Sequence, residues 1–216
     1  MNREAGSLSW QTRALYAVVA VTLTGCGGLR SDRAVEQVYV LQAAAPAASV
    51  EPVPAVLRVA RPDVQPGLDT NLIVVTRPGN ELDYIAASRW GTPLPKVLSA
   101  FVVESLSRSG IFKLTVGAET GGVQGAFELL LTARHFEAAY SAANGAPTAQ
   151  VAFDCVLTTG APRRVVGRCD ASAEHPASDN RVGAIVQALE QAAQQALGSV
   201  GTTAAQLARA ELAVRK

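Results

Sequence analysis

Histidines, cysteines and a Ser-Asp pair beside a histidine are the side chains of this 216-residue sequence best suited to catalysis or metal binding. His135 falls inside an apolar run typical of a strand, and His175 precedes Pro176 in a polar turn. Ser178 and Asp179 follow His175 without the strand-turn-helix elbow that exposes a catalytic nucleophile. We therefore expect no enzymatic activity, no metal site and no cofactor.

Cys26 is different, because it closes an apolar run with the sequence Leu23-Thr24-Gly25-Cys26. The run Ala14–Leu23 is ten residues long, whereas a helix that crosses a bilayer needs about 20 apolar residues. This run resembles the apolar region of a signal peptide. The motif Leu23-Thr24-Gly25-Cys26 resembles the cleavage site of bacterial lipoproteins. The alternative is an ordinary signal peptide that happens to end near a cysteine. The match predicts a lipoprotein signal peptide over residues 1–25.

Acylation of Cys26 is the chemistry that this site predicts. A diacylated thiol and an acylated amine together carry three chains, and each buried methylene contributes about 0.8 kcal/mol to membrane binding. Such an anchor holds far more firmly than one myristoyl group. Residues 26–36 contain glycines and polar side chains and are expected to form a flexible tether between lipid and domain.

The charge of the mature chain limits its partners. The sequence has 19 Lys and Arg against 18 Asp and Glu, and Arg3, Arg13 and Glu4 belong to the predicted signal peptide, which leaves 17 of each sign. A neutral chain has no basic field to attract nucleic acid or anionic lipid. We expect no nucleic-acid partner, and any lipid contact beyond the anchor should be apolar.

Cys155 and Cys169 remain after lipidation of Cys26. An even pair in an exported chain is most simply assigned to a disulfide. The flanking residues alternate as two strands with a turn over residues 160–164. If Cys155 lies opposite Cys169, then Phe153 faces Ala171 and Leu157 faces Gly167, so that one register satisfies the whole pattern.

The first part of the chain predicts strands joined by short connections. Glu36–Gln42 and Val56–Ala60 are strand-like, and Ala43–Pro54, with three prolines, is expected to be a linker. Asn71–Thr76 and Glu81–Ala86 predict a hairpin with a type II turn at Pro78-Gly79.

The middle of the chain predicts one helix and one long strand. Thr92 is expected to cap a helix with apolar residues at three-four spacing from Leu94 to Leu106, which Gly110 ends. Ile111–Val116 predicts a strand and residues 117–125 a glycine-rich loop. Phe136 and Tyr140 fall out of phase with the preceding apolar residues of the run 126–140, so a β-bulge is expected near Arg134 or His135.

The C-terminal part predicts helices. Ser178 or Asp179 is expected to cap a helix from Val182 to Val200, and Thr203–Arg215 has a third, weaker helical pattern. The order of elements predicts an α+β domain over residues 37–200, with an antiparallel sheet and two main helices on one face. Residues 201–216 are expected to form a C-terminal helical tail.

Glu81, Tyr84, Arg89 and Trp90 place two charges and two large aromatic side chains within ten residues ahead of the first helix. One interpretation is structural, with Tyr84 and Trp90 covering the end of the sheet. The other is a partner-binding edge, because Tyr, Trp and Arg are enriched at binding hot spots.

Several motifs in order resemble the ABC-type transport auxiliary lipoprotein family, which includes paraquat-inducible protein C. They are the lipobox, the strand Val38–Leu41, Glu81-Leu-Asp-Tyr84, Ser88-Arg-Trp90, Leu94-Pro95, Phe127–Leu131 and Arg134–Glu137. Ile85 stands where the family pattern often has a second tyrosine. The resemblance implies a lipoprotein that works beside an ABC transporter and an MCE-domain protein moving lipids or other hydrophobic molecules across the periplasm.

We therefore expect a non-enzymatic lipoprotein anchored to the periplasmic face of the outer membrane, with homo-oligomers possible. Gly27 agrees with that location, because it is not the aspartate that retains lipoproteins in the inner membrane. The alternative function is an outer-membrane assembly or pilotin-like lipoprotein that chaperones another envelope protein. An apolar groove between helix and sheet would favour transport, and a groove filled by a partner strand would favour the chaperone.

Overall fold

A long central strand, β7 (Phe127–Ala139), organises the sheet in this computed structural model, which describes residues 35–44, 51–142 and 145–214. One edge of β7 pairs antiparallel with β8 (Thr148–Thr159) along its full length. Three short strands follow one another along the other edge, all parallel to β7. They are β2 (Val53–Val59), β3 (Asp63–Val64) and β4 (Leu72–Arg77).

The remaining strands extend this arrangement on both sides. β5 (Glu81–Trp90) pairs with β4, and β1 (Gln37–Tyr39) pairs parallel with β5 at the end of the sheet. β6 (Phe112–Gly117) lies parallel to β2 at the opposite end. β9 (Val165–Arg168) and β10 (Ala171–Pro176) both pair antiparallel with β8. Within the described residues this makes one ten-stranded sheet.

The α+β class is confirmed, but the prediction of an antiparallel sheet is wrong because the sheet is mixed. β2, β3 and β4 run parallel to β7 although no helix connects them to one another. Parallel neighbours normally need a long crossover. Here the strands are only two to seven residues long, and each leaves the edge of β7 before the next begins.

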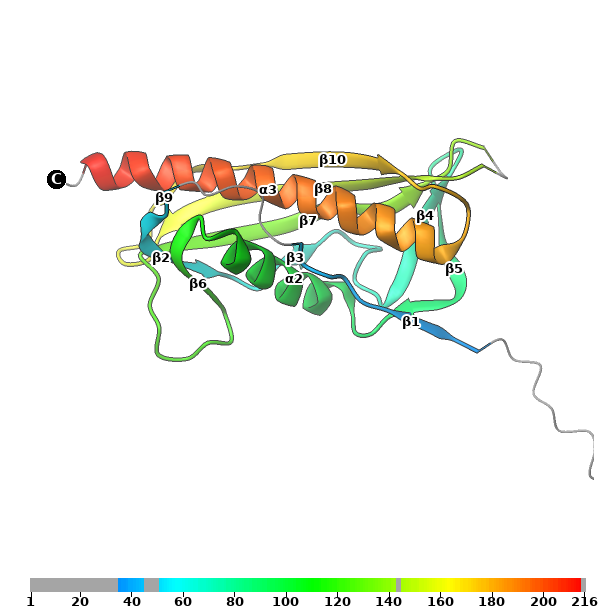
Figure 1. Ribbon diagram of the computed structural model, residues 1–216, viewed down its shortest axis with the longest axis horizontal. Coiled ribbons are helices and arrows are strands. Elements are labelled where there is room, and N and C mark those ends of the chain that lie inside the picture. Colours follow the sequence, from blue (N-terminus) through cyan, green and yellow to red (C-terminus); the bar gives the residue numbers. More distant parts are fainter. Residues whose placement is uncertain (1–34, 45–50, 143–144, 215–216) are drawn as a thin grey trace, which may run out of the picture. The chain divides into compact units, whose positions relative to one another are not determined.

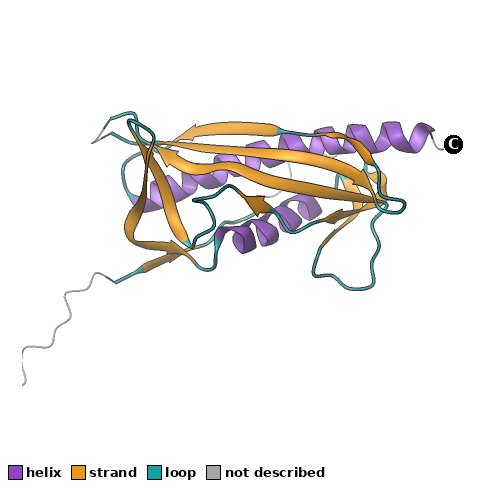
Figure 2. Ribbon diagram, turned by 180° about the vertical axis from the view of Figure 1, so that it is seen from behind, coloured by secondary structure: helices purple, strands orange, loops and turns teal. Residues whose placement is uncertain are grey.

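Two helices cover one face of the sheet, as predicted. α2 (Leu94–Ser109) and α3 (Val182–Val214) lie in front of the strands in Figure 1 and behind them in Figure 2. α2 buries its apolar stripe, including Leu98, Phe101 and Val102, against β6 and its neighbours. α3 packs mainly on β8 and β10. No helix of the described chain is long and apolar enough to cross a membrane.

The start of α2 corrects one detail. Thr92 does not cap the helix, because the residue at the cap position is Pro93 and no side chain accepts a hydrogen bond from the first turn. The amide of Leu94 donates instead to the carbonyl of Thr70 at 2.9 Å, so tertiary contact satisfies the group that a cap would have served. Gly110 ends the helix with a φ of +62°, as predicted.

α3 corrects the predicted division at residue 200. It continues without a break to Val214 and buries Gly201, Ala204, Ala205 and Ala208, so residues 201–214 belong to the domain. A β-carbon at Gly201 would lie 3.0 Å from Leu106 Cδ2. Close packing of a glycine against α2 therefore outweighs the low helix propensity of Gly201, Thr202 and Thr203.

Two other predictions concern loops and bulges. The bulge in β7 is confirmed, because the register with β8 shifts between Ala133 and His135 and returns Phe136 to the core at 2% exposure. The linker predicted over residues 43–54 is too long at its end, since β2 begins at Val53. Pro54 is tolerated there because the β2–β6 register is interrupted between Val53 and Val56.

Candidate functional site

The predicted site residues on β5 lie on two halves of a bent strand. The pairs Val74–Tyr84 and Leu72–Arg89 show that β4 advances two residues while β5 advances five. Ala87 has a φ of +50° within this stretch. The bend directs the first half of β5 to the hairpin corner of the sheet and the second half to β1 (Figures 1 and 2). The structure therefore does not gather the four residues into one site.

Glu81 and Tyr84 belong to the hairpin half and are exposed. Glu81 begins β5 directly after the turn, where Gly79 has the φ of +90° that a type II turn requires. The Tyr84 side chain is 39% exposed. Its amide donates to Asp83 at 2.8 Å, and Arg77 Nε donates to the same carboxylate at 2.9 Å. These two contacts, the amide first, lower the pKa of Asp83.

Arg77 also ties the hairpin to the end of β7. Its guanidinium lies 5.3 Å from the centre of the Tyr140 ring, within the range of a cation–π contact. Burial raises the pKa of Tyr140, and the charge of Arg77 opposes that shift. In the hairpin, Arg77 and Asp83 are therefore paired with each other, while Glu81 and Tyr84 are exposed.

Trp90 belongs to the core, so the partner-binding interpretation does not hold at this position. Only 1% of Trp90 is exposed, and its ring meets Phe136 edge-on with centroids 6.0 Å apart. The structural interpretation therefore holds for Trp90. The bulge in β7 and the bend in β5 act together here, because each turns an aromatic ring toward the same contact.

Arg89 is half-exposed and fastens β1 to the domain. Arg89 Nε donates to Glu36 Oε2 at 2.7 Å, just ahead of β1. The backbone adds a hydrogen bond from Gly91 N to the carbonyl of Tyr39 at 3.1 Å. Nothing in the local sequence pointed to Glu36, because the two charges lie 53 residues apart.

Residues 40–44, which we call the strap, leave β1 and cross the helices. The amide of Gln42 donates to Glu190 Oε2 at 2.8 Å, and Gln194 Nε2 donates back to the Gln42 carbonyl at 3.0 Å. Arg108 Nη1 donates to the Ala43 carbonyl at 2.9 Å. The strap therefore contacts both α2 and α3. Its sequence, Val-Leu-Gln-Ala-Ala, gave no sign of these contacts.

Cys155 and Cys169 form a disulfide between β8 and the junction of β9 and β10, with Cα atoms 4.8 Å apart. The predicted register is the observed one, since Leu157 faces Gly167 and Phe153 faces Ala171. Asp170 accepts hydrogen bonds from Arg168 Nε and from the amide of Cys155, each at 2.8 Å. These contacts, the guanidinium first, lower the pKa of Asp170.

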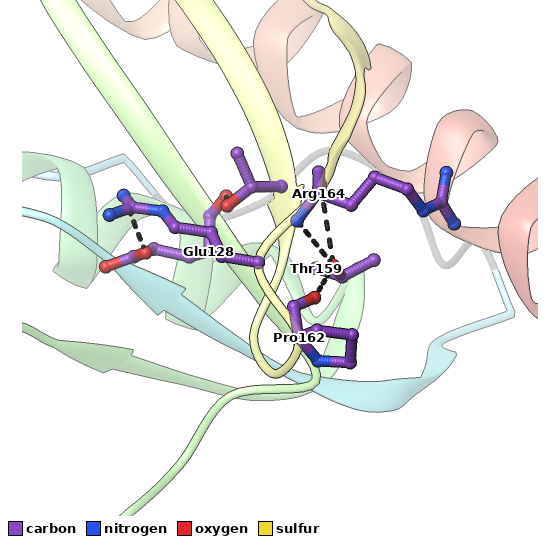
Figure 3. Close-up of polar contacts among 6 residues, drawn as sticks. Glu128, Thr159, Pro162 and Arg164 are labelled. Atoms are coloured by element: carbon purple, nitrogen blue, oxygen red, sulfur yellow. Dashed lines mark hydrogen bonds and ion pairs between the residues drawn. The ribbon is translucent and has the colours of Figure 1, made fainter.

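The turn between β8 and β9 is held by polar contacts (Figure 3). Thr159 Oγ1 donates to the carbonyl of Pro162 at 2.5 Å and accepts from the amide of Arg164 at 2.9 Å. The Arg164 side chain then pairs with Glu211 on α3. This turn therefore fastens the C-terminal half of α3 to the sheet.

A groove of about 1,030 Å³ lies between α2 and the loop that follows β6. Its lining mixes the apolar Ala100 and Val103 with charged side chains that include Arg61, Lys96 and Glu119. Arg58 holds the loop by donating to the carbonyls of Ala118 and Val123 at 2.6 and 3.2 Å. A mixed groove between a helix and a loop is not the apolar helix–sheet groove expected of an acyl-chain carrier.

The histidines take part in local contacts. His135 Nδ1 lies 2.6 Å from Glu137 Oε1 beside the bulge, and His175 Nδ1 lies 3.1 Å from the carbonyl of Pro176. No group of three or more His, Cys, Asp or Glu among the described residues could hold a metal ion. Cys26 and the predicted signal peptide lie outside the described residues.

Comparison with known proteins gives a family match that covers most of the domain. The family model described as "ABC-type transport auxiliary lipoprotein component" matches residues 39–201, from the end of β1 into α3. No curated protein matches the chain.

Solved structures share the fold at low sequence identity. Protein XCC0632 from Xanthomonas campestris has a TM-score of 0.70 and 23% identity, covering 83% of this chain and 99% of its own. An uncharacterized protein has a TM-score of 0.61 and 16% identity, with coverage of 79% and 99%. The hypothetical protein CT253 from Chlamydia trachomatis has a TM-score of 0.50 and 8% identity, covering 73% and 99%.

Proposed function

The chain belongs to the ABC-type transport auxiliary lipoprotein family, and we propose that it is a non-enzymatic component of an ABC and MCE-type system that moves lipids or other hydrophobic molecules. The observation that carries the proposal is the family match over residues 39–201, which covers most of the described domain. In this role the protein is anchored through Cys26 to the periplasmic face of the outer membrane. Its partners are the MCE-domain protein and the transporter.

The mixed groove beside α2 is not the apolar groove that would favour lipid transport by this chain itself, so the proposal gives the chain an auxiliary role and not a carrier role. A carrier must shield an acyl chain from water, and charged groups in a binding site oppose burial of apolar chains. The groove contains Arg61, Lys96 and Glu119. In this proposal the protein therefore binds another component of the system, and the lipid passes elsewhere.

The hairpin is the partner surface that we propose. Tyr84 is the exposed aromatic side chain among the four candidate residues, and Leu82, on the same face of β5, is also exposed at 43%. Arg77 and Asp83 pair with each other on the opposite face of the hairpin, so they leave Tyr84 and Leu82 as its apolar surface. An exposed tyrosine is a side chain enriched at binding hot spots.

Capture of an MCE-domain protein from the same organism tests the role. The acylated wild type should retain it, and Tyr84→Ser should weaken capture about tenfold or more, since a hot spot contributes about 2 kcal/mol. Leu114→Ser is the matched control, because Leu114 is an apolar side chain with 45% exposure on β6. Equal capture by wild type and both variants would remove the hairpin from the interface. Failure of the wild type to capture would argue for the pilotin-like alternative.

Metabolic labelling tests the anchor independently. Radioactive palmitate should mark the wild type, and Cys26→Ala should remain as an unlabelled precursor because its acceptor thiol is gone. Equal labelling of both chains would show that Cys26 is not the acceptor.

A further inference from the structure

The segment around β1 is apolar on both of its faces. Tyr39 and Leu41 pack against the core, while Val38 and Val40 are 53% and 62% exposed. β1 pairs with β5 and with no other described strand. Terminal strands usually carry charges or proline on their free side, because these discourage unwanted pairing. Exposed valines on both sides of Tyr39 therefore suit an apolar environment better than water.

The length of chain ahead of β1 limits where this segment can be. Nine residues separate Cys26 from Glu36, so ten peptide units connect them. A fully extended chain spans at most about 3.3 to 3.6 Å per residue, which gives a maximum of about 36 Å. Glu36, one residue before β1, can therefore lie no farther than this from an anchored Cys26.

We propose that Val38 and Val40 contact the lipid bilayer that holds the acylated Cys26. This inference rests on the proposed anchor. Charge does not oppose the contact, because the neighbouring Arg89 and Glu36 neutralise each other at 2.7 Å. The apolar character of the contact also agrees with the zero net charge of the mature chain, which gives no attraction to anionic headgroups.

A strand from another protein is a poorer occupant of this surface. β1 has only three residues, and strand addition depends on repeated backbone hydrogen bonds along an edge. Val40 also lies beyond the end of β1, where no ladder continues. A bilayer needs no such register, and the chain is already attached to it.

The contact sets the orientation of the domain. Because β5 bends between its two halves, the hairpin with Tyr84 lies at a different corner from β1 (Figure 1). A bilayer against Val38 and Val40 leaves the hairpin free to meet a partner. A contact of two side chains is weak compared with three acyl chains, so it orients the protein and does not anchor it.

A fluorescence measurement tests this surface. In the mature acylated protein, Val40→Cys is labelled with an environment-sensitive nitrobenzoxadiazole group and placed in vesicles of phosphatidylethanolamine and phosphatidylglycerol. Val165→Cys is the matched control, because Val165 is 61% exposed on β9, toward the other end of the sheet. Acylation of Cys26 and the Cys155–Cys169 disulfide leave the introduced thiol as the labelling site.

Nitroxide-bearing lipids should quench the label at residue 40 at least threefold more than the label at residue 165. A second variant, Val38→Cys, should behave like Val40→Cys. Equal quenching at all three positions would overturn the proposal. A change in emission at residue 40 without quenching by the nitroxide lipids would also overturn it, because it would indicate contact with a protein partner or a second copy of this chain. Mass spectrometry of the same sample establishes acylation, so loss of the anchor is distinguished from loss of the contact.

Discussion

Arg89 holds Glu36 by a 2.7 Å hydrogen bond from Nε to Oε2, which joins the start of β1 to the second half of β5. An exposed pair of this kind contributes only about 0.2 to 1 kcal/mol to global stability. Its importance is local, because β1 has only three paired residues. The pair therefore controls how firmly the N-terminal segment is attached.

Charge reversal at Arg89 should loosen β1 with little effect on the core. In Arg89→Glu two carboxylates face each other, so the amide of Gly91, which donates to Tyr39, should exchange faster with deuterium. The unfolding free energy should fall by about 1 kcal/mol or less. The double variant Glu36→Arg with Arg89→Glu should restore slow exchange. Unchanged exchange in the single variant would contradict this assignment.

Truncation of Trp90 should be far more damaging than truncation of the exposed Tyr84. Trp90→Ala removes a fully buried ring and its edge-on contact with Phe136, and should cost about 3 to 5 kcal/mol. Tyr84→Ala should change stability by about 0.5 kcal/mol. Guanidinium unfolding of both variants measures the difference, and similar midpoints would show that Trp90 is not part of the core.

The disulfide should leave no free thiol in the mature acylated protein. Thiol counting after unfolding without reductant should give zero. Reduction should then lower stability by about 3 kcal/mol, because the cysteines are separated by 14 residues and loop closure sets the size of the effect. Detection of two thiols would show that Cys155 and Cys169 remain reduced.

Two glycines on α3 provide a matched test of its packing. Gly201→Leu places a side chain where a β-carbon already meets Leu106 and Ile111 at 3.0 and 3.2 Å, and should cost about 1 to 3 kcal/mol. Gly198 has open space around it, so Gly198→Leu should be neutral or stabilise by up to about 1 kcal/mol through helix propensity. Equal effects would show that residues beyond 200 do not pack on α2.

Acid should remove the stabilising effect of Asp170. Its pKa in the folded protein lies below the usual 3.8, so the unfolded chain takes up the proton first as the pH falls. The contribution is complete above about pH 5 and is lost as the pH drops through 3.8 toward the folded pKa. Asp170→Asn should therefore lower the melting temperature at pH 6 and reduce its fall between pH 6 and pH 3. Parallel curves for both proteins would contradict this role.

Alternating patterns were sufficient to predict the strands whose neighbours lie close in sequence. The hairpin of β4 and β5, the bulge near Arg134 and the pairing of Phe153 with Ala171 all follow from local side-chain parity. The parallel alignment of β2, β3 and β4 along β7 could not be predicted, because parity does not distinguish strand directions. The burial of Trp90 depends on the bend at Ala87. The sequence did not predict this bend, because no glycine, asparagine or proline lies within β5.

The candidate site was harder to predict than the fold. Glu36 and Arg89 meet across 53 residues, and the strap meets Glu190 across 148. Such contacts arise from topology and leave no periodic signal in the sequence. The composition of residues 43–54 predicted a linker and gave no sign of the hydrogen bond that Ala43 accepts from Arg108. The sequence therefore predicted contacts between neighbouring strands, but not contacts between residues far apart in the chain.

The strap also determines how the domain responds to mechanical force. With the proposed anchor at Cys26, a bound partner that moves away from the membrane would pull the domain at Glu36. That load reaches the three β1 pairs first and then the hydrogen bonds of Gln42 and Ala43 to α3 and α2. The force would therefore be shared between the sheet, through β1, and the two helices, through the strap, before it reaches the residues that lead to β2. Because these bonds are few and lie at the periphery, we expect them to break under load before the core does.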